Sequence, residues 1–344
     1  MGAGSKEAGS LKPIITAIVA NSIIAISKGI GYIFSGSSAL LSETIHSIAD
    51  VMNQSLLLIG IKRGEKEENE LFHYGYSQER FFWNLVSAMG IFVLGCGVTV
   101  YHGVHDLLTP GTSKTGGTEE IIIQIVLLVS LLVEGYSFYV AIKEIQDNAN
   151  VRGKKFFTYL NESMDPSVSA IFWEDLAAII GILLAFTGIL LTSLTGIKAF
   201  DSVASILIGL LMGWIAYHLA IENKKFLIDR SIPEFEMNQV LGILKENELI
   251  ESYSEVKSIV FGPNRLKVSA KVQLKVEKIS LGLVEKIIEE LKSNNIQKID
   301  LNELEKILST FAIELYKAKT QQLELVRAEF ETSIPSLKHV ELRI

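Results

Sequence analysis

Long apolar stretches alternate with short polar segments up to about residue 230, and this pattern predicts membrane-spanning helices. Six stretches reach the length of about 20 residues that a helix needs to cross a bilayer. They lie at residues 11–34, 39–61, 81–107, 121–142, 168–194 and 200–221. The segment SGSS separates the first two stretches and TGIK separates the last two, so each of these pairs is expected to form a tight turn.

The pattern changes after Arg230, where charged and apolar residues begin to mix. Segments that read as amphipathic helices lie at 233–250, 281–294 and 303–334. Segments that read as strands lie at 254–262, 264–276 and 337–344. This order is typical of a small α+β domain with helices on one face of a sheet. The predicted parts are a cytoplasmic tail at 1–10, an α-helical transmembrane domain at 11–230 and an α+β domain at 231–344.

The composition agrees with this division and excludes several classes of protein. Of the 344 residues, 49% are hydrophobic, and the mean hydropathy of +0.34 is high for a soluble globular protein. The net charge is −7 without a long basic run, so nucleic-acid binding is not expected. The single cysteine, Cys96, excludes an intrachain disulfide and a cysteine-rich metal site. It is interpreted as a small buried hydrophobic residue.

Positive residues indicate how the predicted helices are oriented. The positive-inside rule is satisfied if the N-terminus lies in the cytoplasm. The cytoplasmic side then holds Lys62, Arg63, Lys66, Arg80, Lys143, Arg152, Lys154, Lys155, Lys224, Lys225 and Arg230, and the other side only Lys114 and Lys198. The tail at 1–10 lacks the arginine-rich amphipathic pattern of an organelle transit peptide. We therefore expect a multi-pass protein of the inner cell membrane with both termini in the cytoplasm.

Ionisable side chains within the predicted spans are candidates for a functional site, because burial in a bilayer is costly for them. Glu43, His46 and Asp50 lie three and four residues apart, so they share one face of the second span. A histidine and an aspartate at this spacing suit a first-row divalent ion such as Zn²⁺. One helix supplies only two ligands, so Glu174 and Asp175 of the fifth span are candidates to complete the shell. These neighbours point about 100° apart on their helix.

Other polar residues in the spans have simpler interpretations. Glu43 lies nearer the outer end of its helix, where it would cap backbone groups or reach water, and direct coordination of the metal is the alternative role for it. Glu134 is a candidate for pairing with a lysine or relaying protons, and Lys28 is a secondary candidate. Asp201 begins the sixth span, where a carboxylate interacts favourably with the helix dipole. A group at the outer end of the third span, interpreted as interfacial, comprises His102, His105 and Asp106.

Three motifs resemble those of the cation diffusion facilitators, the zinc-transporter family. The segment SGSSALLSETIHSIADVMNQ at 35–54 looks like the second-span signature, in which an acidic residue precedes His-x-x-x-Asp. The segment FHYGYSQERFFWNLVSAMG at 72–90 is similar to the cytoplasmic loop before the third span, and FDSVASILIGLLMGW at 200–214 resembles the sixth span. The resemblance covers nearly the whole chain. It implies a ferredoxin-like fold for the cytoplasmic domain and a homodimer formed through it.

The resemblance also implies a set of metal ligands. It carries the transport site over to His46, Asp50 and Asp175, with Glu174 as the fourth ligand. Most members place His or Asp four residues before the fifth-span aspartate, whereas this chain has Ile171 there. The branch with a Glu-Asp variant looks closest. In the loop before the third span, Phe72 and Tyr76 occupy the positions where many members have paired histidines for an accessory zinc site. The cytoplasmic domain has a single histidine, His339, so the clustered-histidine zinc sites of other members are not expected there.

The expected function is secondary transport rather than enzymatic catalysis. The chain would export divalent cations, above all Zn²⁺, from the cytoplasm in exchange for protons, without a prosthetic group. Coupling has a simple basis, because metal binding needs neutral imidazole and ionised carboxylates that later accept protons. One alternative is a Mn²⁺ or Fe²⁺ transporter, which an oxygen-rich ligand set favours. Another is a non-transporting membrane regulator or scaffold of the same fold. The His-Glu-x-x-His motif of a membrane metalloprotease is absent from the sequence.

Overall fold

The computed structural model describes residues 11–109, 118–293 and 300–343. The chain divides into two compact units, Met1–Ile228 and Asp229–Ile344. The predicted tail at 1–10 lies outside the described residues, and so does Lys114.

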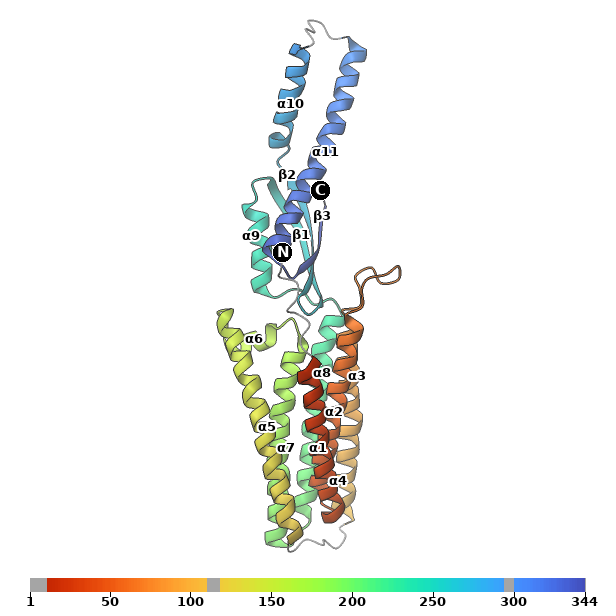
Figure 1. Ribbon diagram of the computed structural model, residues 1–344, viewed down its shortest axis with the longest axis vertical. Helices are drawn as coiled ribbons and strands as arrows, with labels where there is room; N and C mark the ends of the chain where they lie inside the picture. The colour runs from red at the N-terminus through yellow and green to blue at the C-terminus, as the bar shows by residue number, and fades with distance from the viewer. Residues whose placement is uncertain (1–10, 110–117, 294–299, 344) are drawn as a thin grey trace. The chain divides into compact units, whose positions relative to one another are not determined.

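The first unit is a bundle of long helices that run alongside one another (Figure 1). Its helices are α1 (Leu11–Ser35), α2 (Ser38–Gly64), α3 (Glu79–Gly90), α4 (Thr99–Leu108), α5 (Thr118–Val151), α6 (Phe156–Glu162), α7 (Pro166–Thr195) and α8 (Ala199–Leu227). A π-helical segment, Ile91–Val98, joins α3 to α4 into one continuous span. The six predicted helical stretches are all present, and the π-helical segment within the third is the feature that periodicity did not predict.

Helix α2 differs from the other long helices of this bundle. Within the described residues, the segments that are long and apolar enough to cross a membrane belong to α1, α3–α4, α5, α7 and α8. Helix α2 has 27 residues, enough to span, but its buried positions include Ser42, Glu43, His46 and Ser47. It packs against α1, α3, α7 and α8. Its polar side chains therefore face protein instead of lipid, which is the arrangement that a bilayer permits.

Small residues bring α4 and α8 close together. A Cβ atom added at Gly209 of α8 would lie 3.0 Å from the backbone nitrogen of Val100. One added at Gly103 of α4 would lie 3.1 Å from the backbone nitrogen of Ile206. Without a hydrophobic driving force in lipid, helices associate through such close packing of small residues. The glycines thus fix α8 against the third span.

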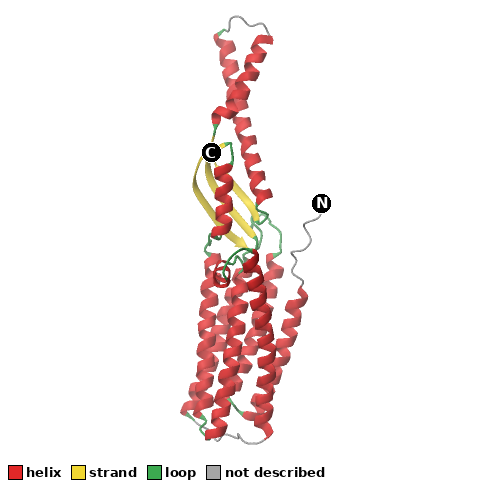
Figure 2. Ribbon diagram, turned by 90° about the vertical axis from the view of Figure 1, so that its left-hand side faces the viewer, coloured by secondary structure: helices red, strands yellow, loops and turns green. Residues whose placement is uncertain are grey.

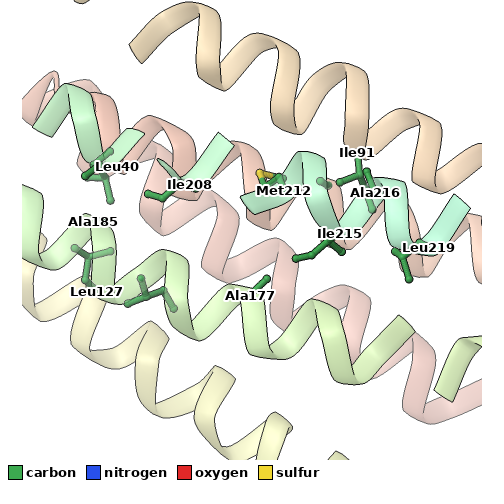
Figure 3. Packing of buried hydrophobic residues seen from close by; sticks show 14 of the residues in the cluster. Leu40, Ile91, Leu127, Ala177, Ala185, Ile208, Met212, Ile215, Ala216 and Leu219 are labelled. Atoms are coloured by element: carbon green, nitrogen blue, oxygen red, sulfur yellow. The ribbon is translucent and has the colours of Figure 1, made fainter. Parts of the chain in front are cut away.

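Buried apolar side chains from several helices meet in one cluster at the centre of the bundle (Figure 3). Leu40 of α2 and Met212 of α8 are among its largest members, and both are almost fully buried. Ala177 and Ala185 place small side chains on α7 where the helices approach. This apolar packing holds α2, α7 and α8 together around the polar residues of α2.

The apolar pattern ends the fourth predicted helix at residue 142, but the helical structure extends beyond it. Helix α5 continues to Val151, and α6 follows before α7 begins. Ile145 and Ala149 lie one helical turn apart and pack in a second cluster with Tyr159, Leu160 and Phe172. The burial of this apolar stripe stabilises the helix although the surrounding sequence is polar.

The second unit is a three-stranded sheet with helices, coloured separately in Figure 2. Its elements are α9 (Glu234–Glu246), β1 (Ile250–Gly262), β2 (Arg265–Leu274), α10 (Val276–Ser293), α11 (Leu301–Ser333) and β3 (Leu337–Arg343). Strand β2 lies in the centre, antiparallel to β1 and parallel to β3. The predicted order of elements is confirmed. Asn264 turns the β1–β2 hairpin at a φ of 54°, a conformation that asparagine tolerates better than most residues.

The described part of this unit has the order helix, two strands, two helices and strand. A ferredoxin-like unit has two βαβ halves, and the arrangement here corresponds to that fold without its first strand. The parallel pair β2 and β3 requires a crossover connection, which α10 and α11 supply. Val326 and Phe330 of α11 are buried, so the C-terminal part of this helix contributes to the core of the unit.

Candidate metal site

The start of α2 is fixed by two oxygen acceptors. Ser37 Oγ accepts a hydrogen bond from the backbone N–H of Leu40 at 3.1 Å. Asp201 of α8 accepts from Ser37 Oγ at 2.6 Å and from the backbone N–H of Ser38 at 2.6 Å. These acceptors satisfy N–H groups that a helix start leaves unpaired. Asp201 does lie in the first turn of α8, but its carboxylate also sets the position of α2 against α8.

His46 and Asp50 form the central part of the polar face of α2. His46 Nε2 lies 3.6 Å from Asp50 Oδ2, and their side chains are only 6% and 15% exposed. The spacing of four residues places both groups on one face, as the sequence predicted. His46 Nε2 has no hydrogen-bond partner among the described residues. The pair thus provides an imidazole nitrogen and a carboxylate oxygen that could coordinate the same cation.

Glu43 is paired with a lysine one helix away. Lys28 Nζ of α1 donates to Glu43 Oε2 at 2.9 Å and to Ser47 Oγ at 3.0 Å. The side chains of Lys28 and Glu43 are both 0% exposed. The expectation that Glu43 caps backbone groups or reaches water was wrong. The ion pair replaces hydration for both groups, because neither side chain is exposed.

Glu174 of α7 is hydrogen-bonded to the side-chain amide of Asn53 on α2. Asn53 Nδ2 donates to both carboxylate oxygens of Glu174 at 2.7 Å. Ser87 Oγ of α3 donates to Asn53 Oδ1 at 2.7 Å, which fixes the orientation of the amide. Asn53 follows Asp50 by three residues, so it continues the polar face of α2. Glu174 is therefore held on the face of α2 that carries the histidine and the aspartate.

Asp175 turns toward a different helix from its neighbour. Its Oδ2 accepts a hydrogen bond from Ser137 Oγ of α5 at 3.1 Å. Also on α5, Glu134 is 7% exposed and interacts electrostatically with Asp50 and His46. Asp175 in turn interacts with the charges of Glu134 and Asp50. The two adjacent acids of α7 thus face α2 and α5 respectively, as their angular separation of about 100° requires.

The four residues predicted as ligands are therefore brought together in part. His46 and Asp50 are neighbours, and Glu174 and Asp175 lie on the helix packed beside them. Among the residues that the structure describes, no three His, Cys, Asp or Glu side chains are close enough to hold one metal ion. Glu174 and Asp175 have amide and hydroxyl partners in place of a shared ion. Ile171, four residues before Asp175, is 44% exposed and lies on the outer side of α7.

The group at the outer end of the third span is a cluster of neighbouring polar side chains around Asp106. Asp106 accepts from Ser38 Oγ, and its carboxylate oxygens lie 3.7 Å from His102 Nδ1 and 3.7 Å from His105 Nδ1. The ring of Tyr32 meets the ring of His102 edge-on. These contacts join α4 to the start of α2 and to the end of α1, so they have a clear structural role.

Sequence reasoning identified the ionisable residues but not the polar groups that orient them. Asn53, Ser87 and Ser137 hold the acids of α7, and single amides or hydroxyls in an apolar span give no distinctive signal. The pairing of Lys28 with Glu43 did have a signal. Lys28 precedes the turn at Gly36 by eight residues and Glu43 follows it by seven, so an antiparallel hairpin places both at one depth.

Comparison with known proteins gives a family match over the helical unit. Residues 14–228 match the family model described as the cation efflux transmembrane domain. Metal tolerance protein C4 of Arabidopsis thaliana is 30% identical over 341 residues, which cover 97% of this chain and 73% of that protein. Magnetosome protein MamB of Magnetospirillum gryphiswaldense is 21% identical over 236 residues, which cover 69% of this chain and 72% of that protein.

A longer relative matches to the same degree. The mitochondrial proton-coupled zinc antiporter SLC30A9 of Homo sapiens is 30% identical over 334 residues, which cover 97% of this chain. The matched region makes up 58% of the human protein, so this chain spans less than two thirds of that relative.

Proposed function

The chain belongs to the cation efflux family, the cation diffusion facilitators, and from this premise we propose that it is a secondary transporter of Zn²⁺ that works by exchange with protons. The substrate and the coupling go beyond family membership. They are supported by the similarity to a relative described as a proton-coupled zinc antiporter and by the chemistry of the polar residues within the bundle.

The buried pair of His46 and Asp50 is the observation that carries the proposal. An imidazole nitrogen without a hydrogen-bond partner among the described residues stands 3.6 Å from a carboxylate oxygen, inside a helical bundle. Nitrogen and oxygen ligands of this kind are those that Zn²⁺ prefers. Asp175 and Glu174 complete the proposed site from α7. To bind the ion, Asp175 exchanges Ser137 for the metal, while Glu174 turns one oxygen to the metal and keeps Asn53 on the other, so loading draws α7 toward the polar face of α2.

Protons compete with the metal for the same atoms. The imidazole of His46 and the carboxylates of Asp50, Asp175 and Glu174 bind a metal ion only when they are deprotonated. On the side where the ion is released, protons take its place, and alternating access returns the loaded site to the other side. The neutral or positive site that results is able to reorient through the bilayer without a metal ion.

The direction of transport follows from the proposed orientation. Several lysines and arginines lie at one end of the bundle: Arg63 at the end of α2, Lys66 in the α2–α3 connection, Lys154 in the α5–α7 connection and Lys224 at the end of α8. Under the positive-inside rule this end of the bundle faces the cytoplasm, so export leads away from it. We place the protein in the inner cell membrane, as a homodimer joined through the unit Asp229–Ile344. The human relative is described as mitochondrial, which makes an organelle membrane the alternative.

Zinc flux into proteoliposomes with an imposed pH gradient tests the proposal. We expect Asp50→Ala and Asp175→Ala each to reduce proton-driven Zn²⁺ uptake at least about tenfold, the loss of one ligand interaction of 1.4 kcal/mol or more. Asp147→Ala is the matched control, since Asp147 is exposed on α5, and it should keep wild-type flux. Full zinc flux in both site variants would refute the assignment.

Two alternatives have distinct outcomes in the same assay. A site with three carboxylates and one imidazole is rich in oxygen, which favours Mn²⁺ or Fe²⁺. Uptake of either ion at the expense of Zn²⁺ would support that reading. The outward position of Ile171 and the separated acids of α7 favour the second alternative, a membrane regulator of the same fold. Stoichiometric zinc binding that depends on His46, without flux, would support it.

A further inference from the structure

The ion pair between Lys28 and Glu43 is a fully buried charge pair that the proposed transport site does not use. Each side chain is 0% exposed, and the ammonium lies 2.9 Å from the carboxylate. A lysine within a membrane span is costly, and the replacement of such a pair by apolar residues is often neutral or stabilising. Stability alone therefore does not explain why α1 carries a lysine at this position.

Glu43 has the chemistry and the position of a metal ligand. It precedes His46 by three residues, so it stands about one helical turn from the imidazole on the same face of α2. Its Oε1 has no hydrogen-bond partner among the described residues. That oxygen lies against Gly181 of α7, where an added Cβ atom would overlap it. A carboxylate oxygen is thus buried beside the site, between the two helices that supply the proposed ligands.

Lys28 neutralises this carboxylate and holds it in place. Its ammonium donates to Glu43 Oε2 and also to Ser47 Oγ, one turn further along α2. The bond to Oε2 ties one carboxylate oxygen to α1, and the bond to Ser47 fixes the ammonium that holds it. The ammonium also adds one positive charge near the site, and unit charges one helical turn apart interact strongly even at an effective dielectric constant of about 20.

Resting on the proposed function, we infer that Lys28 sets the affinity of the transport site by keeping Glu43 out of the metal coordination shell. A carrier has to release its ion, and each additional carboxylate around a cation strengthens binding. With Lys28 in place, the ion meets the ligands His46, Asp50, Asp175 and Glu174 and a compensated Glu43. Without the lysine, Glu43 becomes an additional anionic ligand. Lys28 thus sets the affinity of the site without touching the metal.

Zinc binding by isothermal titration of the full chain in lipid nanodiscs tests this inference. We expect Lys28→Met to tighten Zn²⁺ binding at least about tenfold and to slow zinc release, because the freed Glu43 joins the shell. Glu43→Gln should weaken binding at least about tenfold, because the unpaired ammonium repels the ion. The double variant Lys28→Met/Glu43→Gln should return to within about threefold of wild type, a cancellation that loss of a purely structural contact does not produce.

Unchanged or weaker zinc binding in folded Lys28→Met would overturn the inference. If Lys28→Met does not fold, Glu43→Gln decides the question alone, and unchanged or tighter binding in that variant counts against it. Asp50→Ala separates the two proposals. Wild-type binding in Asp50→Ala means that the transport site itself is misplaced. Lost binding in Asp50→Ala combined with unchanged binding in Lys28→Met rejects only the role of Lys28.

Discussion

The polar face of α2 has two parts, which differ in whether a lysine neutralises the acidic side chain. At Glu43, a carboxylate is matched by the ammonium of Lys28 at 2.9 Å, and both are sealed from solvent. From Asp50 to Asn53, Asp50 lies 3.6 Å from the imidazole of His46, and Glu174 of α7 accepts a hydrogen bond from the amide of Asn53. Within the described part of the chain, no Lys or Arg forms an ion pair with Asp50 or Glu174.

The comparison indicates that a carboxylate on this helix has a structural role where a protein cation neutralises it and a metal-binding role where none does. A buried carboxylate that has its own protein cation has no need of a further ion. A group of half-buried acids without such a cation requires protons or a metal ion for charge balance. The first part of the face therefore joins α1 to α2, and the second part is the region where a divalent cation would enter. The predictions below separate the two parts by their effects on stability and on metal binding.

The largest expected effect is on stability, at the paired end. Glu43→Leu leaves the Lys28 ammonium buried without its partner, which should lower the free energy of unfolding by about 3–5 kcal/mol. The double variant Lys28→Met/Glu43→Leu should recover most of this loss, because neither charge remains. The midpoints of thermal unfolding of the wild type, the single variant and the double variant, measured in the same detergent, provide the comparison. Equal destabilisation by the single and double variants would show that packing, and not charge, holds this end.

Gly181→Ala should give the next largest effect. The added methyl group overlaps Glu43 Oε1, so the ion pair or α7 has to move, with a loss of about 1–3 kcal/mol in unfolding free energy. Gly135→Ala is the matched control, since nothing lies within 4 Å of a Cβ atom at this glycine of α5. Chemical unfolding of both variants measures the difference. If both behave alike, the carboxylate is not packed against α7.

Asn53→Ala should act on the other part of the face. Removal of the amide frees Glu174 from its orientation, and loss of such an outer partner typically costs 10–100-fold in metal affinity, about 1.4–2.7 kcal/mol. Ser55→Ala serves as control, because the Ser55 hydroxyl donates to the carbonyl of Val51 on its own helix. Zinc titration of both variants provides the readout. Equal affinities would mean that Glu174 needs no positioning or is not a ligand.

The sequence predicted most of the fold and the ionisable part of the site, for physical reasons. Apolar runs of spanning length locate the long helices, and the period of α2 places His46 and Asp50 together. The helical segment after Ile142 was missed, because Ile145 and Ala149 form a stripe that is stabilised only by its packing against Tyr159 and Leu160. Tertiary burial of this kind overrides a polar local composition.

The orientation of the two acids of α7 was beyond a one-dimensional pattern. Glu174 and Asp175 are adjacent, so the sequence states only that they diverge by about 100°. Which of them faces α2 depends on the rotation of α7, and that rotation is set by the packing of Ala177 and Ala185 in the central cluster. The structure assigns Asn53 to Glu174 and Ser137 to Asp175, and neither partner follows from spacing.

The most direct test of this account is a structure of the protein soaked with Zn²⁺, with the metal located by anomalous scattering. The account predicts one zinc ion at about 2.0–2.2 Å from His46, Asp50, Asp175 and Glu174, the usual range for these ligands. Glu43 should remain on Lys28. A zinc ion coordinated by Glu43 while Lys28 is displaced, or one bound away from α2, would contradict it.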